Sequence, residues 1–363
     1  MPRNEPSQPY DDLPPLPPQQ DLETKPVLKA CLAATRALAE LKGAGGLIPD
    51  QTILINAIPL QEAKASSEIE NIVTTQDDLF SADIDDTNAG DPATKEVLRY
   101  RTALREGYEA LQSGGTLSLE VIRQLCSTIQ GKAMPFRADG ENVSIGNPVA
   151  RTISYTPPSG GEAVLGLLQN LESFLGEPSD SLDPLIRMAV AHYQFEAIHP
   201  FKDGNGRTGR ILNILCLIQS GLLDIPVLYL SRHIIENKER YYTLLRSVTE
   251  QEDWESWLLY MLEGVESTAR WTTGRIHAIR ELFDQTVERV RTEEQTIYSK
   301  ELVELIFRRP YCKIGFVVDA GLAKRQTASV YLQKLEALGI LESEKRGRET
   351  VYRHPALLKV LAQ

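Results

Sequence analysis

The sequence lacks the features that mark secreted, membrane-spanning and disulfide-bonded proteins. Its cysteines are widely spaced and form no CxxC pair, which argues against a disulfide framework and against a zinc cluster. The start of the chain has no basic and apolar leader, and no run reaches about 18 apolar residues. We therefore expect a cytoplasmic protein with reduced thiols. The four cysteines are Cys31, Cys126, Cys216 and Cys312.

Positive charge is also scarce, since 39 Lys and Arg residues against 50 Asp and Glu residues give a formal net charge of −11. A protein whose whole surface binds nucleic acid would carry the opposite sign. The P-loop pattern GxxxxGK[ST] and the serine nucleophile elbow do not occur, and no internal repeat is evident. With 363 residues, 42% of them hydrophobic, the chain is long enough for two or three globular domains.

Proline is concentrated at the start, where seven of the 21 prolines fall within the first 20 residues. This composition predicts an extended segment over residues 1–21. Beyond it, apolar residues recur with helical spacing. The predicted helices cover residues 22–41, 59–72, 94–112, 118–129, 161–175, 183–198, 206–220, 240–248 and 254–296.

Residues 142–158 depart from the helical pattern. Strand-forming residues such as Val143, Ile145 and Ile153 are interrupted there by Gly-Asn-Pro at 146–148. The pattern predicts a small hairpin on a mainly α domain that covers about residues 20–290.

Candidate chemistry is concentrated in the segment HPFKDGNGRTGR, residues 199–210. Pro200 disfavours helix at His199, so the histidine is expected at a helix end. A histidine with an ordinary pKa of about 6.5 suits a base that takes a proton from a hydroxyl. A purely structural histidine fits the same position. Asp203 suits either a Mg²⁺ ion that phosphates also bind or a helix cap.

The glycines and arginines of this segment suit an anion. Gly204, Asn205 and Gly206 precede a strongly apolar helix, where main-chain amides and the helix dipole favour negative charge. A turn with a helix cap would use the same residues. Arg207 and Arg210 share one face of the first turn and can clamp a polyphosphate. Because a helix start disfavours cations, they predict a bound anion or a neutralising acid.

Two histidines and an acid also suggest a metal site. His192, Glu196 and His199 are spaced four and three residues apart, which suits zinc or iron. Their order is not that of the HExxH helix, and His199 fits the phosphate chemistry better. We therefore favour the phosphate site.

The segment HPFKDGNGRTGR resembles the signature of the Fic (filamentation induced by cyclic AMP) family of protein adenylyltransferases, with every functional position filled. The resemblance implies a mainly α, Fic-type helical bundle with a small β-hairpin flap. It implies that His199 deprotonates a Ser, Thr or Tyr hydroxyl of a target protein or of the enzyme itself, which attacks the α-phosphate of ATP. It places Asp203 on Mg²⁺. The implied ATP-binding positions are Glu70, Gly204, Asn205, Gly206, Arg207, Thr208, Gly209, Arg210 and Asn237.

The segment SSEIEN contains Ser66 and Glu70, four residues apart on the predicted second helix, followed by Asn71. Alone, these residues fit an amphipathic helix with a solvated acid. SSEIEN resembles the inhibitory motif of the Fic class that carries its brake on an N-terminal helix. The resemblance implies that Glu70 pairs with Arg210, occupies the γ-phosphate position and leaves ATP unreactive. In some relatives the equivalent acid also supports AMP removal, so a reverse activity stays open.

Two further sites follow from the resemblance, which extends over most of residues 10–265. Asn237 matches a position near adenine, although a helix cap fits it equally well. Residues 152–155 match the flap, where a target segment adds as a strand. The flap positions are Thr152, Ile153, Ser154 and Tyr155.

Residues 297–363 carry twelve Lys or Arg and seven Asp or Glu, so the net charge changes from −16 before this stretch to +5 within it. Its pattern of helix, turn, amphipathic helix and hairpin resembles a winged-helix domain, a small α+β fold. We expect Val330, Leu332, Leu335 and Leu338 to include the core-facing positions. The residues expected near the exposed start of this helix are Lys324, Arg325, Gln326, Thr327 and Ser329. A protein contact fits this domain better than DNA, because +5 is modest for phosphate binding.

These patterns divide the chain into a Pro-rich segment (1–21), a helical region with the inhibitory helix (22–110), a catalytic core (111–265), a connecting helix (266–296) and a winged helix (297–363). The leading hypothesis is an ATP- and Mg²⁺-dependent enzyme that transfers AMP to protein hydroxyls and is restrained by Glu70. The alternative is a DNA-binding transcription regulator whose ATP site senses nucleotide. Phosphate transfer on the same fold is less favoured, because the resemblance implies that kinase-like relatives depart from this signature, whereas Gly206 and Arg210 are both present here.

Overall fold

The computed structural model describes residues 5–48, 50–82, 91–147, 152–176, 182–346 and 349–362. Helices predominate, as predicted, and the strands form two small antiparallel sheets. In chain order the elements are α1 (Lys25–Gly45), α2 (Thr52–Ile69), α3 (Gln76–Ala82), α4 (Pro92–Gln112), α5 (Leu119–Gln130), β1 (Ile145–Asn147), β2 (Thr152–Tyr155), α6 (Glu162–Gly176), α7 (Pro184–Ile198), α8 (Asn205–Gln219), α9 (Leu230–Glu236), α10 (Lys238–Gln251), α11 (Trp254–Glu293), α12 (Lys300–Arg308), β3 (Tyr311–Lys313), α13 (Ile314–Asp319), α14 (Arg325–Ala337), β4 (Glu342–Arg346), β5 (Glu349–Arg353) and α15 (Pro355–Ala362).

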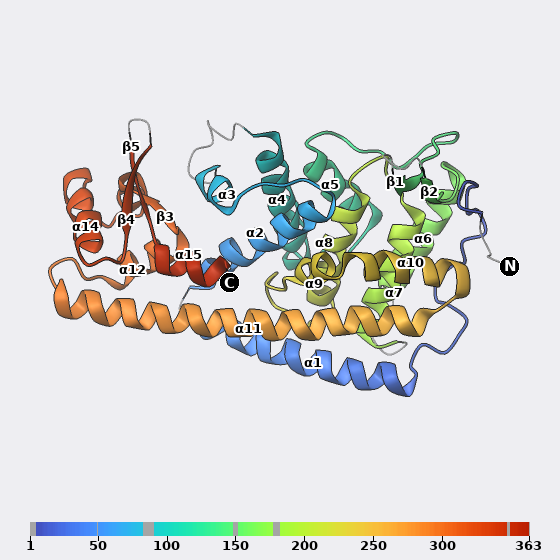
Figure 1. Ribbon diagram of the computed structural model, residues 1–363, viewed down its shortest axis with the longest axis horizontal. Coiled ribbons are helices and arrows are strands. Elements are labelled where there is room, and N and C mark those ends of the chain that lie inside the picture. The colour runs from blue at the N-terminus through green and yellow to red at the C-terminus, as the bar shows by residue number, and fades with distance from the viewer. Residues whose placement is uncertain are drawn as a thin grey trace.

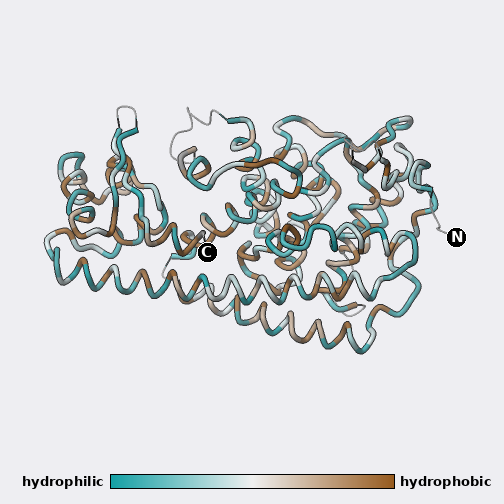
Figure 2. Tube along the Cα trace, viewed as in Figure 1, coloured by the Kyte–Doolittle hydropathy of each residue, from teal (hydrophilic) through white to brown (hydrophobic). Residues whose placement is uncertain are grey.

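The long helix α11 runs along the molecule and supports both of its ends (Figure 1). Its 40 residues span about 60 Å at the usual rise per residue. The first half packs on α7, α9 and α10, the second half on α12 and α15, and α1 lies along it. Apolar residues alternate with polar ones along α1 and α11, as expected for helices that bury one side (Figure 2). Among the described residues, no helix is both long and apolar enough to span a membrane.

Helix caps explain several of the boundaries that the sequence predicted. The Ser118 side chain accepts a hydrogen bond from the Val121 N–H and begins α5. Asp183 caps α7 in the same way, with Pro184 as the first helical residue. At the other end of α5, Gly131 adopts a φ of 66°, a left-handed conformation that glycine tolerates best.

Helix α2 departs from the prediction at both ends. We expected it to begin at Pro59, but it begins at Thr52, and the proline lies inside it. Ile53, Leu54 and Ile58 are buried on the earlier turns, so packing outweighs the hydrogen bond that proline removes. The helix ends at Ile69, which makes Glu70 its C-cap residue rather than a helical one.

Other predictions missed whole elements. Helices α3, α9, α12 and α15 and strand β3 were not expected, and α10 is longer at both ends than residues 240–248. Most of these elements have eight residues or fewer. Such short segments contain too few apolar residues to show a helical repeat of 3.6 residues in the sequence. The predicted helix 254–296 ends three residues early, at Glu293.

The N-terminal segment extends over the surface of the helical body. The Tyr10 N–H donates to the Thr156 carbonyl, beside the hairpin. The Asn170 side chain on α6 accepts from the Leu16 N–H and donates to the Leu16 carbonyl. Tyr10, Leu13 and Leu16 are buried in the hydrophobic core, so this segment is part of the folded body.

The predicted hairpin is present between α5 and α6. Strands β1 and β2 pair in antiparallel fashion, with Asn147 opposite Thr152 and Gly146 opposite Ile153. Its turn, and Arg151 with it, lies outside the described residues.

The C-terminal module has the topology of a winged helix. Helices α12, α13 and α14 precede the hairpin β4–β5, and the sheet order is β3-β5-β4. Leu332 and Leu335 on α14 are fully buried, as predicted. The prediction for Val330 was wrong, since this side chain is 46% exposed. The buried stripe follows Ala328, Leu332 and Leu335, at four and three residues apart, and Val330 lies off it. The hairpin tip, residues 347–348, lies outside the described part.

This module is docked on the start of the second helix. The Arg308 guanidinium contacts the Asp50 carboxylate, two residues before α2, at 2.5 Å. The Tyr311 hydroxyl donates to the Asp77 carboxylate on α3. The ring of Tyr311 also stacks on Phe80, with centroids 5.6 Å apart. The winged helix therefore contacts the N-terminal region as well as α11.

We predict that His354 makes the protein less stable in mild acid. Burial lowers its pKa to about 4, whereas an unfolded histidine titrates at about 6.5. The unfolded state therefore binds the proton first, and stability present above pH 6.5 is lost as the pH falls towards about 4, by about 2 kcal/mol at pH 5.

The variant His354→Asn tests this prediction. Its amide oxygen can still accept the Leu357 N–H that now donates to His354 Nδ1, while the titration is removed. In calorimetry, the fall in melting temperature from pH 7 to pH 5 should be smaller in this variant than in the parent. The exposed His277, changed to Asn, is the control. Equal falls in all three proteins would contradict the prediction.

Candidate functional site

The segment 199–210 forms a loop between two buried helices, α7 and α8. His199 ends α7 with a φ of 49°, and Gly204 precedes α8 with a φ of 85°. Both residues have a left-handed backbone conformation, which turns the chain sharply at each end of the loop. Histidine at a positive φ is uncommon and is kept only where surrounding contacts fix it.

Those contacts come from Asn205 and Arg137. The Asn205 side chain accepts from the Phe201 N–H at 2.9 Å and donates to the Phe201 carbonyl at 2.8 Å. The buried Arg137 donates to the His199 and Ile198 carbonyls at 2.9 and 3.0 Å. The sequence did not single out Arg137, because an isolated arginine 62 residues upstream carries no local signal.

His199 is a neutral imidazole in this state. Burial lowers its pKa to about 4, while the Glu196 carbonyl and the carboxylates of Glu70 and Asp203 act in the opposite direction. Its Nδ1 atom is buried and has no hydrogen-bond partner among the described residues. A neutral imidazole at neutral pH is able to accept a proton.

The first turn of α8 offers unpaired main-chain donors. Thr208 is the first residue of the helix whose N–H bonds backwards, to the Gly204 carbonyl, and its hydroxyl donates to the same atom. The N–H groups of residues 205–207 therefore have no intrahelical acceptor. Such a helix start binds anions well. A Cβ atom at Gly206 would collide with the Glu70 side chain, and a Cβ atom at Gly209 would collide with the Glu196 side chain.

Arg210 is buried at the same helix start and is held by α2. Its side chain is 2% exposed. The Nε atom donates to the Ser66 hydroxyl at 2.7 Å, and Nη2 donates to the Ser66 carbonyl at 2.9 Å and to Glu70 Oε1 at 2.8 Å. The structure thus brings Ser66 and Glu70 of the expected inhibitory motif to Arg210, the arginine expected to pair with Glu70.

The Glu70 carboxylate is charged in this position. Burial alone would raise its pKa, but the Arg210 guanidinium, with help from Arg207 and Lys238, holds the pKa below the ordinary value. The side chain is still 35% exposed. Asn71 contributes through its backbone, since its φ of 62° turns the chain away from the end of α2.

Arg207 is the second buried cation at this helix start. Together with Arg210 and the N–H groups of residues 205–207, it forms what we call the anion cradle. It pairs with Glu96 from α4, and its Nη2 lies 3.7 Å from Asp203 Oδ1. Glu96 was missed by sequence analysis because it lies 111 residues away on another helix. Asp203 accepts from the Gly204 N–H at 2.6 Å, and its side chain is 70% exposed. It therefore fixes the residue before α8 without capping the helix itself, and it faces solvent.

The zinc or iron alternative loses its geometric support. Both ring nitrogens of His192 are engaged, Nε2 with the Tyr241 hydroxyl at 2.8 Å and Nδ1 with the Gly209 carbonyl at 3.3 Å. His199 lies outside the helix that carries His192 and Glu196. Among the described residues, no three His, Cys, Asp or Glu side chains are grouped as metal ligands would be.

The remaining predicted positions lie around the loop. Asn237 joins α9 to α10, and its side-chain amide donates to the His233 carbonyl at 3.0 Å, so it acts as a helix cap in this state. Thr152, Ile153 and Ser154 on β2 are exposed. The Tyr155 hydroxyl donates to the Ala197 carbonyl at 2.8 Å, two residues before His199, which fixes the hairpin beside the loop.

Two family models match this part of the chain. The Fic/DOC family N-terminal model matches residues 28–109, and the Fic/DOC family model matches residues 117–217. Together they match half of the chain. The chain belongs to the Fic/DOC family. A third model, the C-terminal domain of SoFic-like protein adenylyltransferases, matches residues 282–357.

Relatives share shorter segments with this Fic protein. It is 38% identical over 92 residues to protein adenylyltransferase fic-1 of Caenorhabditis elegans, covering 25% of this chain and 17% of that protein. It is 37% identical over 97 residues to protein adenylyltransferase Fic of Drosophila grimshawi, covering 26% of this chain and 19% of that protein. The chain thus spans less than a fifth of the length of these two relatives.

Solved structures share the fold. A Fic family protein from Desulfovibrio desulfuricans G20 superposes with a TM-score of 0.59 at 20% identity, over 93% of this chain and 98% of that one. Fic-1 of C. elegans gives a TM-score of 0.53 at 21% identity, over 69% of this chain and 74% of that one.

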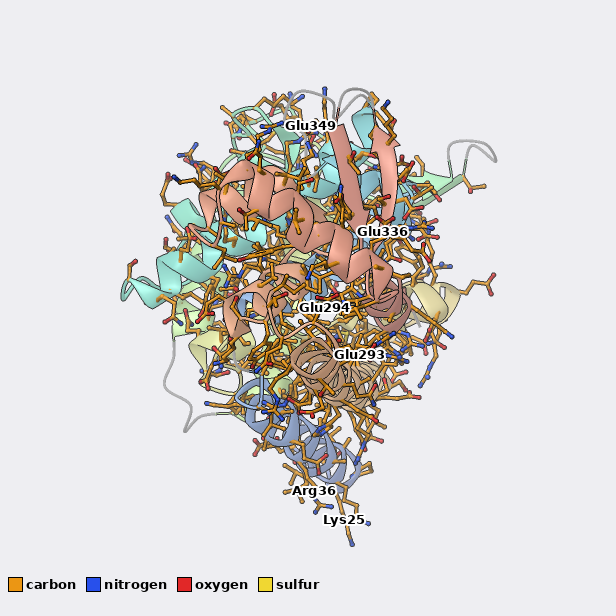
Figure 3. The ribbon with its side chains drawn as sticks, turned by 90° about the vertical axis from the view of Figure 1, so that its left-hand side faces the viewer. Lys25, Arg36, Glu293, Glu294, Glu336 and Glu349 are labelled. Carbon is orange, nitrogen blue, oxygen red and sulfur yellow. The ribbon has the colours of Figure 1, made fainter. Side chains whose placement is uncertain are left out.

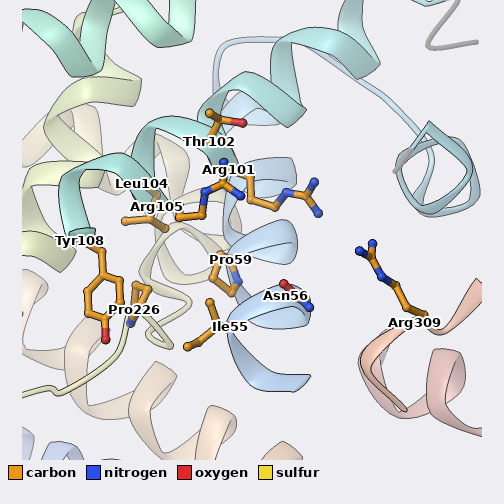
Figure 4. Close-up of a pocket in the computed structure, with 10 residues that line it drawn as sticks. All are labelled: Ile55, Asn56, Pro59, Arg101, Thr102, Leu104, Arg105, Tyr108, Pro226 and Arg309. Carbon is orange, nitrogen blue, oxygen red and sulfur yellow. The ribbon is translucent and has the colours of Figure 1, made fainter. Parts of the chain in front are cut away.

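A pocket of about 210 Å³ lies apart from the loop, between α2, α4 and the C-terminal module (Figure 4). Pro59 of α2, Arg101 and Arg105 of α4, and Arg309 of the module are among its lining residues. No residue of the segment 199–210 lines it, so it is not part of the anion cradle.

We predict that alanine at the two glycines of α8 has unequal effects. A Cβ at Gly206 would meet Glu70 Oε1 and lie 3.0 Å from Arg210 Nη1, the far ends of two long side chains that can shift slightly together and stay paired. A Cβ at Gly209 would lie 2.5 Å from Glu196 Oε1 and 3.1 Å from the buried Phe195 ring. We expect Gly209→Ala to cost about 1–3 kcal/mol of stability and Gly206→Ala much less. Calorimetry of both variants checks this, and equal losses would contradict it.

Proposed function

We propose that this protein transfers AMP from ATP to a hydroxyl group of a protein, and that Glu70 restrains the reaction. The observation that carries the proposal is the contact between Glu70 and Arg210 at the start of α8. A buried cation, aimed at an anion-binding helix start, is neutralised by an acid from another helix. The names of the matched relatives, protein adenylyltransferases, support the same activity.

The reaction needs one proton acceptor and a site that holds phosphates in line. His199 takes the proton of the attacking hydroxyl, and the hydroxyl oxygen forms a bond to the α-phosphorus of ATP. The bond from this phosphorus to its bridging oxygen breaks, and pyrophosphate leaves. The N–H groups of residues 205–207 and the two buried arginines hold the phosphates. Positioning and neutralisation of charge supply most of the catalysis in such transfers.

Asp203 suits a Mg²⁺ ion that accompanies the nucleotide. Its carboxylate is largely exposed, beside the helix start that would hold the phosphates. Magnesium commonly binds through one carboxylate, phosphate oxygens and waters, and it neutralises charge on the phosphates. The main-chain N–H of Gly204 fixes one oxygen of Asp203 in place.

Glu70 competes with the terminal phosphate for Arg210. Its Oε1 atom occupies a hydrogen-bonding position on Nη2 that a γ-phosphate would otherwise take. While Glu70 stays, ATP binds without its productive contact, and attack on the α-phosphorus is slow. Removal of AMP by water, assisted by the same acid, is a second reaction open to this site.

The hairpin is the proposed docking site for the target. Thr152, Ile153 and Ser154 form an exposed strand, fixed beside His199 by the Tyr155 contact with Ala197. Because β1 and β2 form a two-stranded sheet, a target segment can add at an edge through main-chain hydrogen bonds. Such binding presents a hydroxyl to the histidine without strong demands on target sequence.

The winged helix is better suited to contact protein than DNA. Several of its basic side chains are paired: Lys313 with Glu349, Lys334 with Glu294, Arg346 with Glu344 and Arg353 with Glu342. Glu293, Glu294, Glu336 and Glu349 lie towards the same end of the molecule (Figure 3). Exposed cations are present at Lys324 and Arg325. DNA binding needs several neutralised phosphates, so a transcription regulator is not favoured.

A cytoplasmic location agrees with the chemistry of the thiols. All four cysteines are free, and three of them are buried. Burial raises the pKa of Cys126, which lies under the loop and contacts the Asp203 carbonyl, to about 12. Such thiols are unreactive structural groups that need no oxidising compartment.

The central prediction is that Glu70→Gly raises AMP transfer. With α-³²P-ATP, Mg²⁺ and a cell extract as target, label on protein should increase about tenfold or more, because Arg210 becomes available to the γ-phosphate. Adding His199→Ala should remove the label. No label in Glu70→Gly, despite measurable ATP binding, would contradict the proposed function.

A second prediction concerns the metal. Asp203→Asn keeps the oxygen that accepts the Gly204 N–H but loses the charge. In the Glu70→Gly background we expect it to lower transfer about tenfold or more and to raise the Mg²⁺ concentration for half-maximal rate. Lys202→Met, which removes a neighbouring charge from the loop, is the control. An unchanged Mg²⁺ requirement in Asp203→Asn would exclude Asp203 as the ligand.

A further inference from the structure

Helix α2 carries three polar side chains in a row, each four residues from the next. Glu62 and Ser66 are buried, and Glu70 follows at the helix end. Ser66 and Glu70 bind Arg210. Glu62 lies two turns earlier and hydrogen-bonds elsewhere, so the proposed mechanism leaves it without a role.

Glu62 is a buried carboxyl group, 1% exposed, with three hydrogen-bond donors; burial raises its pKa, and the donors on Ser231 and Tyr100 oppose that shift. Oε1 accepts from the Tyr100 hydroxyl of α4 at 3.0 Å and from the Ser231 hydroxyl of α9. Oε2 accepts from the Ser231 main-chain N–H at 2.9 Å. A buried carboxylate is tolerated only with such partners, and it strongly disfavours any movement that breaks them.

The partner on α9 connects Glu62 to Asn237. Ser231 is the second residue of α9, and Asn237 follows this helix and precedes α10. At the start of α10, the Lys238 ammonium donates to the Ile69 carbonyl at 2.5 Å, next to Glu70. The helix pair that carries Asn237 is therefore bonded to α2 at two points, one at Glu62 and one beside Glu70.

The partner on α4 connects Glu62 to the phosphate site. Tyr100 is fully buried, and Glu96, one turn earlier on α4, pairs with Arg207. One face of α4 thus contacts both Glu62 and the second arginine of the cradle. Glu62 lies where these two connections meet.

We propose that Glu62 is a positioning residue for the brake: it fixes α2 against α9, so that Glu70 reaches Arg210. The inference rests on the proposed function, since it concerns the control of that reaction. Because Glu62 and Ile69 bond to the helix pair that carries Asn237, a nucleotide base that shifts this pair also loosens Glu70. Such coupling is reciprocal, so a looser brake also changes nucleotide affinity.

The variant Glu62→Gln tests the proposal by its dependence on background. Glutamine has the same size as glutamate and keeps one acceptor oxygen. Its N–H₂ group replaces the other oxygen, so a donor of Ser231 or Tyr100 then faces a second donor instead of an acceptor. With Glu70 present, we expect label transfer to rise about fivefold to tenfold, since a buried donor loses its acceptor and α2 is held less firmly. In the Glu70→Gly background, the same substitution should give no rise. Structural damage alone would lower transfer in both backgrounds.

Two further variants complete the comparison. Ser231→Ala removes only the hydroxyl donor and keeps the main-chain N–H, so it should act in the same direction with a smaller effect, and it serves if Glu62→Gln does not fold. Glu172→Gln is the matched control, because Glu172 accepts the Leu119 N–H at the start of α5 in the same manner but lies outside this network. It should leave transfer unchanged.

The proposal is overturned if Glu70→Gly raises transfer while Glu62→Gln and Ser231→Ala do not, or if Glu62→Gln lowers transfer in both backgrounds. Absence of label in Glu70→Gly would refute the proposed function instead. Hydrogen exchange of the residue 62–72 amides then decides the inference. We expect faster exchange at residues 66–72 in Glu62→Gln than in the parent and in Glu172→Gln. Unchanged exchange there would overturn it.

Discussion

A buried guanidinium at the positive end of a helix is the constraint on which the rest of the site depends. Arg210 is almost fully buried in the second turn of α8, close to the end where the helix dipole disfavours a cation. An uncompensated charge there costs several kcal/mol. This cost is offset because α2 packs against α8 and brings Ser66 and Glu70 into hydrogen-bonding contact with the guanidinium. In the function that we propose, nucleotide phosphates offer the same compensation, which would give the site two charge-balanced states.

The second arginine extends this constraint to the whole N-terminal region. Arg207 is neutralised by Glu96 from α4, and Arg210 by Glu70 from the end of α2. Both acids lie within the N-terminal match of the Fic/DOC family, while both arginines lie within the second match. The anion cradle is therefore completed across the two matched regions, and neither would be electrostatically balanced alone. Contacts of Arg308 and Tyr311 with Asp50 and Asp77 attach the winged helix to the same N-terminal region.

The sequence predicted what depends on neighbours in the chain. The helix-ending histidine, the glycine-flanked helix start and the hairpin were expected from residues a few positions apart, and the Glu70 contact from resemblance. Arg137, Glu96 and Glu62 were not found, because each acts on a partner on another element and nothing in its own surroundings marks it. The start of α2 was missed for a related reason. Proline predicts a helix start locally, but burial of the preceding turns overrode it.

The same balance of charge sets the strength of the base. In the state with Glu70 on Arg210, burial lowers the pKa of His199 to about 4, which leaves a neutral but weak base. Nearby negative charge opposes burial and raises a histidine pKa, as Glu70 and Asp203 already do in part. In the function that we propose, nucleotide phosphates replace Glu70 on Arg210, and a Mg²⁺ ion on Asp203 cancels part of the negative charge that they bring. The negative charge that remains would take over from Glu70 in opposing the effect of burial on the pKa of His199. In that proposal, one exchange of anions at Arg210 both releases the brake and sets the pKa of the base.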